Sequence, residues 1–495
     1  MVNFKRNIIG RLSVVTLFIL IMSSCTKKEQ SSTTGWDYNN PENGGFEVKA
    51  YEEQETGPGL VFIEGGTFVM GRTEQDVMYN WDNVPRRVTV RSFYMDETEV
   101  KNVDYREYLY WLGRVYGNDY PEVVRKAQPD ELVWRDKLSY NEPLVENYFK
   151  HPAYQDYPVV GVNWIQANDY CAWRTDRVNE NILVNMGILE VDPSQTNDNN
   201  FNTEAYLAGQ YEGLVREDLE DLNPNGAGTR KVRMEDGILL PKYRLPTEAE
   251  WEFAALGLIG NTLFERVIER RIYPWNGHIT RTDDKKAYGD MVANFKRGRG
   301  DYMGVAGNLN DGADVTAPVY SYWPNDYGLY NMAGNVSEWV LDVYRPLNLE
   351  DATDFNPFRG NVYKKKSVDS DGLTLEKDSL GRIKYENVKT EENVNRRNYR
   401  KADNINFLDG DYASVLGQSD WLSNDSIKTS SNDVYEYAKT SMINDKTRVY
   451  KGGSWKDKAY FLSPGSRRFM EEDQQTDDIG FRCAMTRVGS PFKKQ

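Results

Sequence analysis

Hydrophobic residues in this chain recur in short runs, and the first run that predicts ordered structure begins near Leu60. Residues 88–95 alternate between polar positions and β-branched or aromatic ones, and this period of two predicts a strand. Residues 99–110 change to a helical period, with Asn102 as the expected N-cap. Residues 164–173 also predict a helix, because their large apolar residues fall near one face.

Two later segments carry helical patterns. Thr247 and Glu250 form a capping-box pair, in which each side chain bonds the backbone amide of the other residue. Gly257 is placed to end this helix. Residues 336–343 have apolar side chains at i, i+3, i+4 and i+7, and this spacing predicts a second amphipathic helix.

The first residues are typical of an export signal rather than of a folded domain. Residues 1–24 join a basic start to an apolar stretch that is too short to span a bilayer, and small residues precede Cys25. This pattern predicts a bacterial lipoprotein signal peptide, cleaved before Cys25, with lipid on that cysteine. An ordinary signal peptide or an N-terminal membrane anchor is the alternative. Polar residues 25–59 predict a flexible tether, and residues 60–490 predict the folded domain.

Composition restricts the classes of function. The chain has 495 residues, of which 39% are hydrophobic and 13% aromatic, so it is long enough for a substantial core. Its formal charge of −15 argues against nucleic acid and anionic membrane surfaces as partners. A basic partner or a divalent cation fits that charge better. The two histidines, His151 and His278, are too few for a multi-histidine metal site.

Five sequence blocks in one order carry a resemblance to a known family. They are residues 61–71, 244–252, 327–339, 451–455 and 480–484. Together they resemble the formylglycine-generating-enzyme (sulfatase-modifying factor) superfamily. The resemblance implies a mixed α/β (α+β) fold of the C-type-lectin-like kind, with low regular-structure content. Against that family the chain carries three long inserts, at about 111–156, 174–242 and 345–446.

The resemblance also indicates what the chain lacks. In the catalytic members a copper-binding cysteine pair follows the fourth block. Its positions fall here on Asp457 and about Leu462, and neither side chain provides a thiolate ligand or nucleophile. The prediction is therefore that the chain is not an enzyme, with an enzyme of relocated chemistry kept as an alternative.

A disulfide is the next implication of the resemblance. It pairs Cys171 with Cys483, whereas the residues alone leave open two buried free thiols.

Two structural calcium ions are also implied, with oxygen ligands of the kind that a hard cation prefers. The ligands of one ion are the side chains of Asn331 and Glu338 and the carbonyls of Gly334 and Val336. Those of the other are the side chains of Asn294 and Asp311 and the carbonyls of Phe295 and Ala313. The alternative is that Asn331 and Glu338 merely satisfy backbone amides of turns and helix ends.

A narrower resemblance rests on residues 91–111, together with the lipidation pattern and the replaced cysteines. It is to the lipoprotein K family of the type IX secretion and gliding-motility machinery. This implies a non-catalytic, lipid-anchored structural subunit at the periplasmic face of the outer membrane. Such a subunit forms a homo-oligomeric ring with the partner protein N of the same system. The alternative is an outer-membrane lipoprotein that binds glycans or peptidoglycan.

Overall fold

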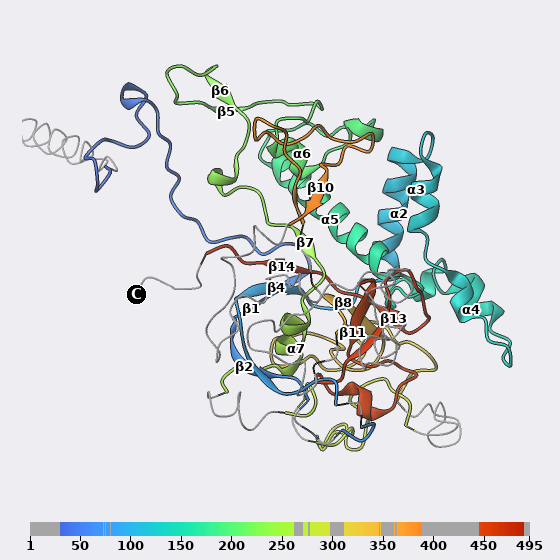
Figure 1. Ribbon diagram of the computed structural model, residues 1–495. Coiled ribbons are helices and arrows are strands. Elements are labelled where there is room, and N and C mark those ends of the chain that lie inside the picture. Colours follow the sequence, from blue (N-terminus) through green and yellow to red (C-terminus); the bar gives the residue numbers. More distant parts are fainter. Residues whose placement is uncertain are drawn as a thin grey trace, which may run out of the picture.

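The computed structural model combines helices with short strands, which confirms the predicted α+β class (Figure 1). The described residues are 30–72, 74, 76–79, 81–261, 271–275, 278–297, 311–345, 347, 361, 364–388 and 445–489. Cys25 and the predicted signal peptide lie outside them, as does most of the third predicted insert.

Two four-stranded sheets form the centre of the molecule. The first has the order β1-β4-β14-β7 and is antiparallel; the second has the order β12-β11-β8-β13, with β8 and β13 parallel. Their strands are β1 (Leu60–Ile63), β4 (Phe93–Asp96), β14 (Ala484–Thr486), β7 (Tyr243–Arg244), β12 (Arg468–Glu471), β11 (Thr447–Lys451), β8 (Ser337–Val343) and β13 (Ile479–Gly480). Both sheets therefore join segments that lie hundreds of residues apart in the sequence.

Three smaller antiparallel pairs lie around these sheets. They are β2 (Gly66–Met70) with β3 (Arg86–Val90), β5 (Leu219–Glu220) with β6 (Thr229–Arg230), and β9 (Lys364–Lys366) with β10 (Tyr385–Asn387). Short 3-10 helices occur at Pro41–Asn43, Glu131–Trp134, Pro152–Tyr154, Asn197–Asn199, Met234–Asp236 and Ala459–Leu462.

The α-helices gather mostly on one side of the sheets (Figure 1). They are α2 (Asn102–Tyr116), α3 (Pro121–Ala127), α4 (Glu142–Asn147), α5 (Trp164–Asn185), α6 (Thr203–Leu207) and α7 (Glu248–Leu256). Helix α7 packs on β2, β3 and β8, while α5 packs on β7, α2 and α6. Helix α5 thus connects the central sheets to the outer helices.

Two predicted elements differ from the structure. Residues 88–95 do not form one strand, because the chain turns near Arg91 and passes from β3, paired with β2, to β4, paired with β1 and β14. Residues 336–343 form no helix. They include β8, which is buried along nearly its whole length, and a strand buried on both faces has a run of apolar residues that a helical spacing also fits.

Other predicted elements are confirmed. Thr247 Oγ1 accepts a hydrogen bond from the Glu250 amide at 3.2 Å, and Glu250 accepts one from the Thr247 amide at 2.9 Å. Gly257 ends α7 with a φ of 55°. The cap of α2 is Lys101, however, and Asn102 is the first helical residue.

The hydrophobic core has one part on each side of the first sheet and a further part in the second predicted insert. Helices α2 and α5 cover one part, and α7 lies within another. Residues 183–239 form a cluster of their own around Phe201, Tyr206 and Tyr211. This part of the second insert therefore carries a small core in addition to that of the central sheets.

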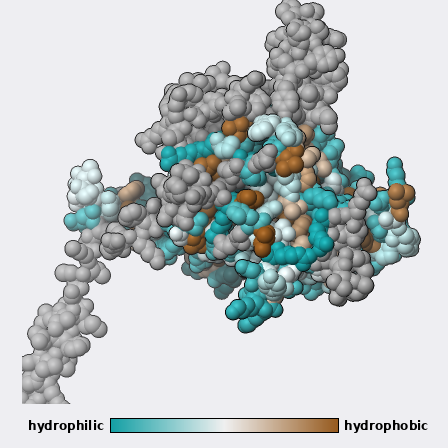
Figure 2. Space-filling view, turned by 90° about the horizontal axis from the view of Figure 1, so that it is seen from below, coloured by the Kyte–Doolittle hydropathy of each residue, from teal (hydrophilic) through white to brown (hydrophobic). Residues whose placement is uncertain are grey.

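The segment expected to be a tether is fastened to the domain at several points. Glu47 forms an ion pair with Arg230, and Gln54 Oε1 accepts a hydrogen bond from the Val488 amide at 2.8 Å. In the face shown by Figure 2, hydrophobic residues stand in small groups between hydrophilic ones. Among the described residues, none of the helices has the length and apolar character needed to cross a bilayer.

Candidate functional site

The sharp turn after β11 shapes the region where the resemblance places the reactive cysteines. Gly452 and Gly453 have φ angles of 95° and 67°, in the left-handed region. A Cβ on Gly452 would lie 3.1 Å from the Trp251 ring, and one on Gly453 would lie 2.9 Å from the Phe461 carbonyl oxygen. Both positions therefore require glycine, and the turn fixes the segment that follows.

Asp457 and Leu462, at the two cysteine positions, have structural partners. Asp457 accepts hydrogen bonds from the Ser454 amide and hydroxyl at 2.9 and 2.7 Å. Arg468 donates to both of its carboxylate oxygens, at 2.7 and 2.6 Å. Leu462 is fully buried in a cluster that includes Phe295. The two positions thus hold an ion-paired carboxylate and a core side chain.

A fully buried ion pair lies beneath this turn. Arg482 donates to the two carboxylate oxygens of Glu338 at 2.6 and 2.7 Å, and both side chains are 0% exposed. The indole Nε1 of Trp251 donates to the same carboxylate at 2.7 Å. Helix α7, strand β8 and the segment before β14 are therefore joined by one charged centre.

Glu99 adds a second buried carboxylate to this centre. Its two oxygens accept hydrogen bonds from the Asn331 and Asn335 side chains, both at 3.0 Å. The pKa of Glu99 is raised to about 7, mainly by burial; Arg482 opposes the rise, and Glu338 adds to it.

The first predicted calcium site, at residues 331–338, has its ligand side chains engaged by Arg482 and Glu99. Both oxygens of Glu338 contact Arg482, and the Asn331 amide donates to Glu99 and to the Val319 carbonyl at 2.9 Å. A cation here would meet a fixed guanidinium charge instead of a free carboxylate. In this arrangement the donor set, including the Gly334 and Val336 carbonyls, does not fit calcium.

The second predicted calcium site is assembled differently. Asp311 accepts hydrogen bonds from the Phe295 amide at 3.1 Å and the Ala313 amide at 3.2 Å, so three of the four residues meet. The Nδ2 of Asn294 donates to the Val315 carbonyl at 2.7 Å, which turns its Oδ1 away from that carbonyl. The set of one carboxylate, one amide oxygen and two carbonyls suits calcium.

The two cysteines expected to pair lie side by side. The Sγ atoms of Cys171, in α5, and Cys483, just before β14, are 3.3 Å apart, and both residues are buried. This distance is longer than the roughly 2.05 Å of a disulfide bond, so the two cysteines are thiols in this structure. The structure brings the predicted partners together, and the bond itself stays a prediction.

We expect Cys171 and Cys483 to be linked in protein isolated from an oxidising compartment. Peptide mapping without reductant should recover their peptides as one species, which reduction separates. Removing the bond with a Cys171→Ala/Cys483→Ala variant should cost about 2–5 kcal/mol of stability. Alkylation of both thiols in the native oxidised protein would contradict the pairing.

A second charged cluster involves Glu248 and Glu252 of α7. Lys451, at the end of β11, is 1% exposed and donates to Glu248 at 3.3 Å and to Glu252 at 3.1 Å. Arg467 donates to Glu248 at 2.7 Å. Burial alone would raise the pKa of Glu248, but Arg467, then Lys451 and Arg86, outweigh it and lower that pKa to about 2.

Sequence reasoning missed both buried clusters. Glu99, Lys451 and Arg482 come from segments far apart in the chain, and no spacing rule connects them. The signal available was indirect: charged residues stand inside otherwise apolar blocks, where an unpaired charge would be costly. Within the described ranges, none of the groups of three or more His, Cys, Asp or Glu side chains has the geometry of a metal site.

Comparison with known proteins identifies the family. Residues 46–391 and 413–487 match the family described as sulfatase-modifying factor enzyme 1-like domain. The mouse formylglycine-generating enzyme is 25% identical over 336 residues, which cover 63% of this chain and 65% of the mouse protein. The mouse protein named inactive C-alpha-formylglycine-generating enzyme 2 is 24% identical, covering 58% of this chain and 70% of that protein. The solved structure of PvdO from Pseudomonas aeruginosa is 16% identical with a TM-score of 0.40, covering 88% of this chain and all of that one.

These relatives correct the prediction that the chain is not an enzyme. Matching proteins from mouse, cattle and two bacteria are named formylglycine-generating enzyme. The replacement of the two cysteines was therefore not sufficient to exclude an enzyme, and that prediction was wrong. Relatives named as inactive match as well, and the family contains both kinds. The chain spans slightly less than two thirds of the length of the mouse enzyme.

Proposed function

The chain belongs to the sulfatase-modifying factor enzyme 1-like family, and from this we propose that it is a lipid-anchored structural subunit of a ring-forming secretion assembly. The assembly is the type IX secretion and gliding machinery at the periplasmic face of the outer membrane. The subunit repeats as a homo-oligomer and contacts the partner protein N. Presence of inactive members in the family is compatible with such a role.

The outer helical layer supports this proposal. Residues 111–156 and 174–242 include α3, α4 and α6, which lie away from the two central sheets (Figure 1). Within this layer Leu138 is 95% exposed and Tyr140 is 82% exposed. Contiguous apolar surface is characteristic of protein–protein contacts, and these two side chains, two positions apart, would supply part of such a surface. Head-to-tail repetition of such a contact closes a ring when the rotation permits.

A paired substitution at these two positions tests the assembly. The full chain, co-expressed with its neighbours, should give large regular particles in negative-stain micrographs. A Leu138→Ser/Tyr140→Ser variant should keep its melting temperature but lose the particles. Ile259→Ser is the control, since Ile259 is also an exposed apolar residue, at 52%, and lies outside the predicted inserts. Particles that persist in the paired variant, or fail to form with the wild type, contradict the proposal.

The names of the relatives make formylglycine formation the second candidate function. Its test is incubation of the full chain with copper, dioxygen, a thiol reductant and a sulfatase-type cysteine peptide, followed by mass spectrometry of the peptide. Conversion of cysteine to formylglycine by the wild type would establish that activity here. Asp457→Ala measures whether the carboxylate bonded to Arg468 takes part in it.

Membrane attachment through Cys25 is part of the proposal. We expect Cys25→Ala to move the protein from the outer-membrane fraction to the soluble fraction or to leave an uncleaved precursor. The reason is that several acyl chains are needed for stable anchoring, and all of them depend on this residue. A processed Cys25→Ala protein that still fractionates with the membrane would contradict lipid anchoring.

Calcium is proposed at residues 294–313, where the donor set fits. Calcium should raise the melting temperature, and a chelator should lower it, because the ion binds the folded state preferentially. Asp311→Asn should abolish that shift by removing the carboxylate. Asp314→Asn is the control, since this neighbouring exposed carboxylate is not one of the four expected ligands. An equal calcium shift in both variants contradicts the assignment.

A further inference from the structure

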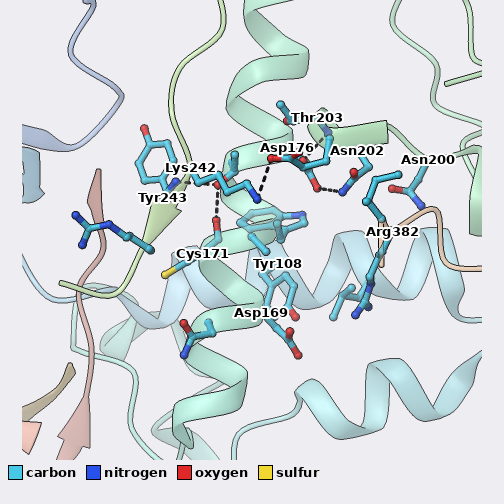
Figure 3. Close-up of a pocket in the computed structure, with 18 of the residues that line it drawn as sticks. Tyr108, Asp169, Cys171, Asp176, Asn200, Asn202, Thr203, Lys242, Tyr243 and Arg382 are labelled. Carbon is cyan, nitrogen blue, oxygen red and sulfur yellow. Dashed lines mark hydrogen bonds and ion pairs between the residues drawn. The ribbon is translucent and has the colours of Figure 1, made fainter. Parts of the chain in front are cut away.

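A cavity of about 300 Å³ lies among the outer helices (Figure 3), and residues of the turn after β11 do not line it. Helices α2 and α5 supply most of its walls, and the start of α6, strand β7 and the segment leading into β10 complete them. All three predicted inserts contribute side chains, among them Trp111, Asp176, Thr203 and Arg382. We call this cavity the insert pocket.

One wall of the insert pocket is aromatic. The ring centroids of Tyr108 and Trp173 are 5.2 Å apart, and those of Trp111 and Trp173 are 6.5 Å apart. These rings offer an apolar surface, and their faces attract cations.

Two hydrogen-bond donors in this wall have no acceptor. The indole Nε1 atoms of Trp111 and Trp173 are buried and have no partner among the described residues, although both residues line the pocket. Trp173 is 9% exposed. Both nitrogens have almost no accessible surface, so these tryptophans present mainly their ring carbons to the cavity.

Most charges of the insert pocket are paired within the protein. Asp176 accepts from the Thr203 amide at 2.8 Å and from Asn202 Nδ2 at 3.0 Å, as Figure 3 shows. Lys242 forms an ion pair with Glu204 at 2.8 Å. These side chains therefore hold one another in place.

Asp169 and Arg382 remain outside these pairs. Within the described part of the chain, Asp169 forms no hydrogen bond through its carboxylate, and neither residue forms an ion pair. Asp169 comes from α5, and Arg382 enters from the segment on the other side of the pocket (Figure 3). Both side chains also reach solvent; partial burial of the Asp169 carboxylate raises its pKa, and Arg382 opposes that shift across the pocket.

We propose that the insert pocket binds a small zwitterion, an amino acid or a dipeptide. Its carboxylate accepts from Arg382, and its ammonium lies between Asp169 and the aromatic faces. The cavity volume is at the low end of the range for ligand sites, so the ligand can be no larger than an amino acid or a dipeptide. A neutral sugar would use the aromatic wall but leave both opposite charges without a partner. The site is independent of the proposed assembly role.

Calorimetric titration of the full chain with alanyl-alanine and its two blocked forms tests the proposal. N-acetylation removes the ammonium and C-amidation removes the carboxylate, so each blocked form should bind about tenfold more weakly, or worse, than the free dipeptide. N-acetylglucosamine is the sugar arm. Binding of the sugar in preference to the dipeptide, or of blocked and free forms equally, overturns the proposal, as does no binding of the free dipeptide at millimolar concentration.

Two variants assign the charges within the pocket. Asp169→Asn should weaken binding of the free dipeptide but leave the affinity for the N-acetylated dipeptide unchanged. Arg382→Gln should likewise weaken binding of the free dipeptide but leave the affinity for the C-amidated dipeptide unchanged. Glu212→Gln is the matched control, because this exposed acid of the same outer layer does not line the pocket. Circular dichroism verifies that each variant is folded. Wild-type affinity in both pocket variants overturns the assignment.

Discussion

Replacement of Glu338 by alanine is expected to destabilise the folded protein by about 3–5 kcal/mol, because it leaves a buried guanidinium without its counter-charge. Arg482 is 0% exposed, and its remaining hydrogen-bond acceptors are the backbone carbonyls of Asp96, Glu97 and Tyr330. The Trp251 indole loses its acceptor as well. Denaturant unfolding, followed by tryptophan fluorescence, measures the loss directly.

An exposed ion pair provides the control for this prediction. Arg135 and Glu142 also form a two-bond pair, at 2.7 and 2.8 Å, but in contact with solvent. Glu142→Ala should leave the unfolding midpoint almost unchanged, since exposed pairs contribute little. A Glu338→Ala/Arg482→Met double variant should recover part of the stability. If the unfolding midpoint of Glu338→Ala changes as little as that of Glu142→Ala, the buried pair is not formed.

Replacement of Lys451 by methionine is expected to cost about 3 kcal/mol at neutral pH, because Glu248 and Glu252 would then share a buried site without the Lys451 ammonium that contacts both. Methionine has nearly the same side-chain length as lysine, so the loss of stability reports the missing charge more than a change in packing. Arg467 still neutralises Glu248, which keeps the effect below that of the preceding variant.

The pH dependence of this loss is a sharper test than its size. Because the folded-state pKa of Glu248, about 2, lies below its value of about 4.3 in an unfolded chain, its ionisation stabilises the protein above pH 4.3. That contribution disappears as the pH falls toward 2. Lys451→Met raises the folded pKa, so its destabilisation should be greatest at pH 7 and shrink below pH 4. A loss that is constant from pH 7 to pH 3 would contradict the electrostatic explanation.

Local patterns predicted local structure well. The Thr247–Glu250 capping box fixed the start of α7, because each partner lies within one helical turn of the other. Residues 336–343 were read wrongly, since a strand covered on both faces, like β8, has no alternation to separate it from a buried helix. The distinction depends on what covers the segment, and neighbouring residues do not specify that.

The candidate sites were predictable to the extent that the resemblance carried them. It placed Cys171 beside Cys483 and Asp311 beside Phe295, and the structure shows both contacts. The resemblance did not predict that Arg482 would form hydrogen bonds with both carboxylate oxygens of Glu338. The insert pocket had no sequence signal, because Trp111 of α2 and Arg382, from the segment before β10, meet Asp169 only after both segments have folded against α5.

The order of strands in the first sheet has a consequence for how the chain folds. Strand β4 lies between β1 and β14, and the amide of Cys483 donates to the Asp96 carboxylate across 387 positions of sequence. This sheet therefore remains open on one edge until the last segment arrives. Contacts of such high sequence separation form slowly. An N-terminal fragment that ends before residue 484 should expose that edge and aggregate, while the intact chain should fold in a late, cooperative closing step.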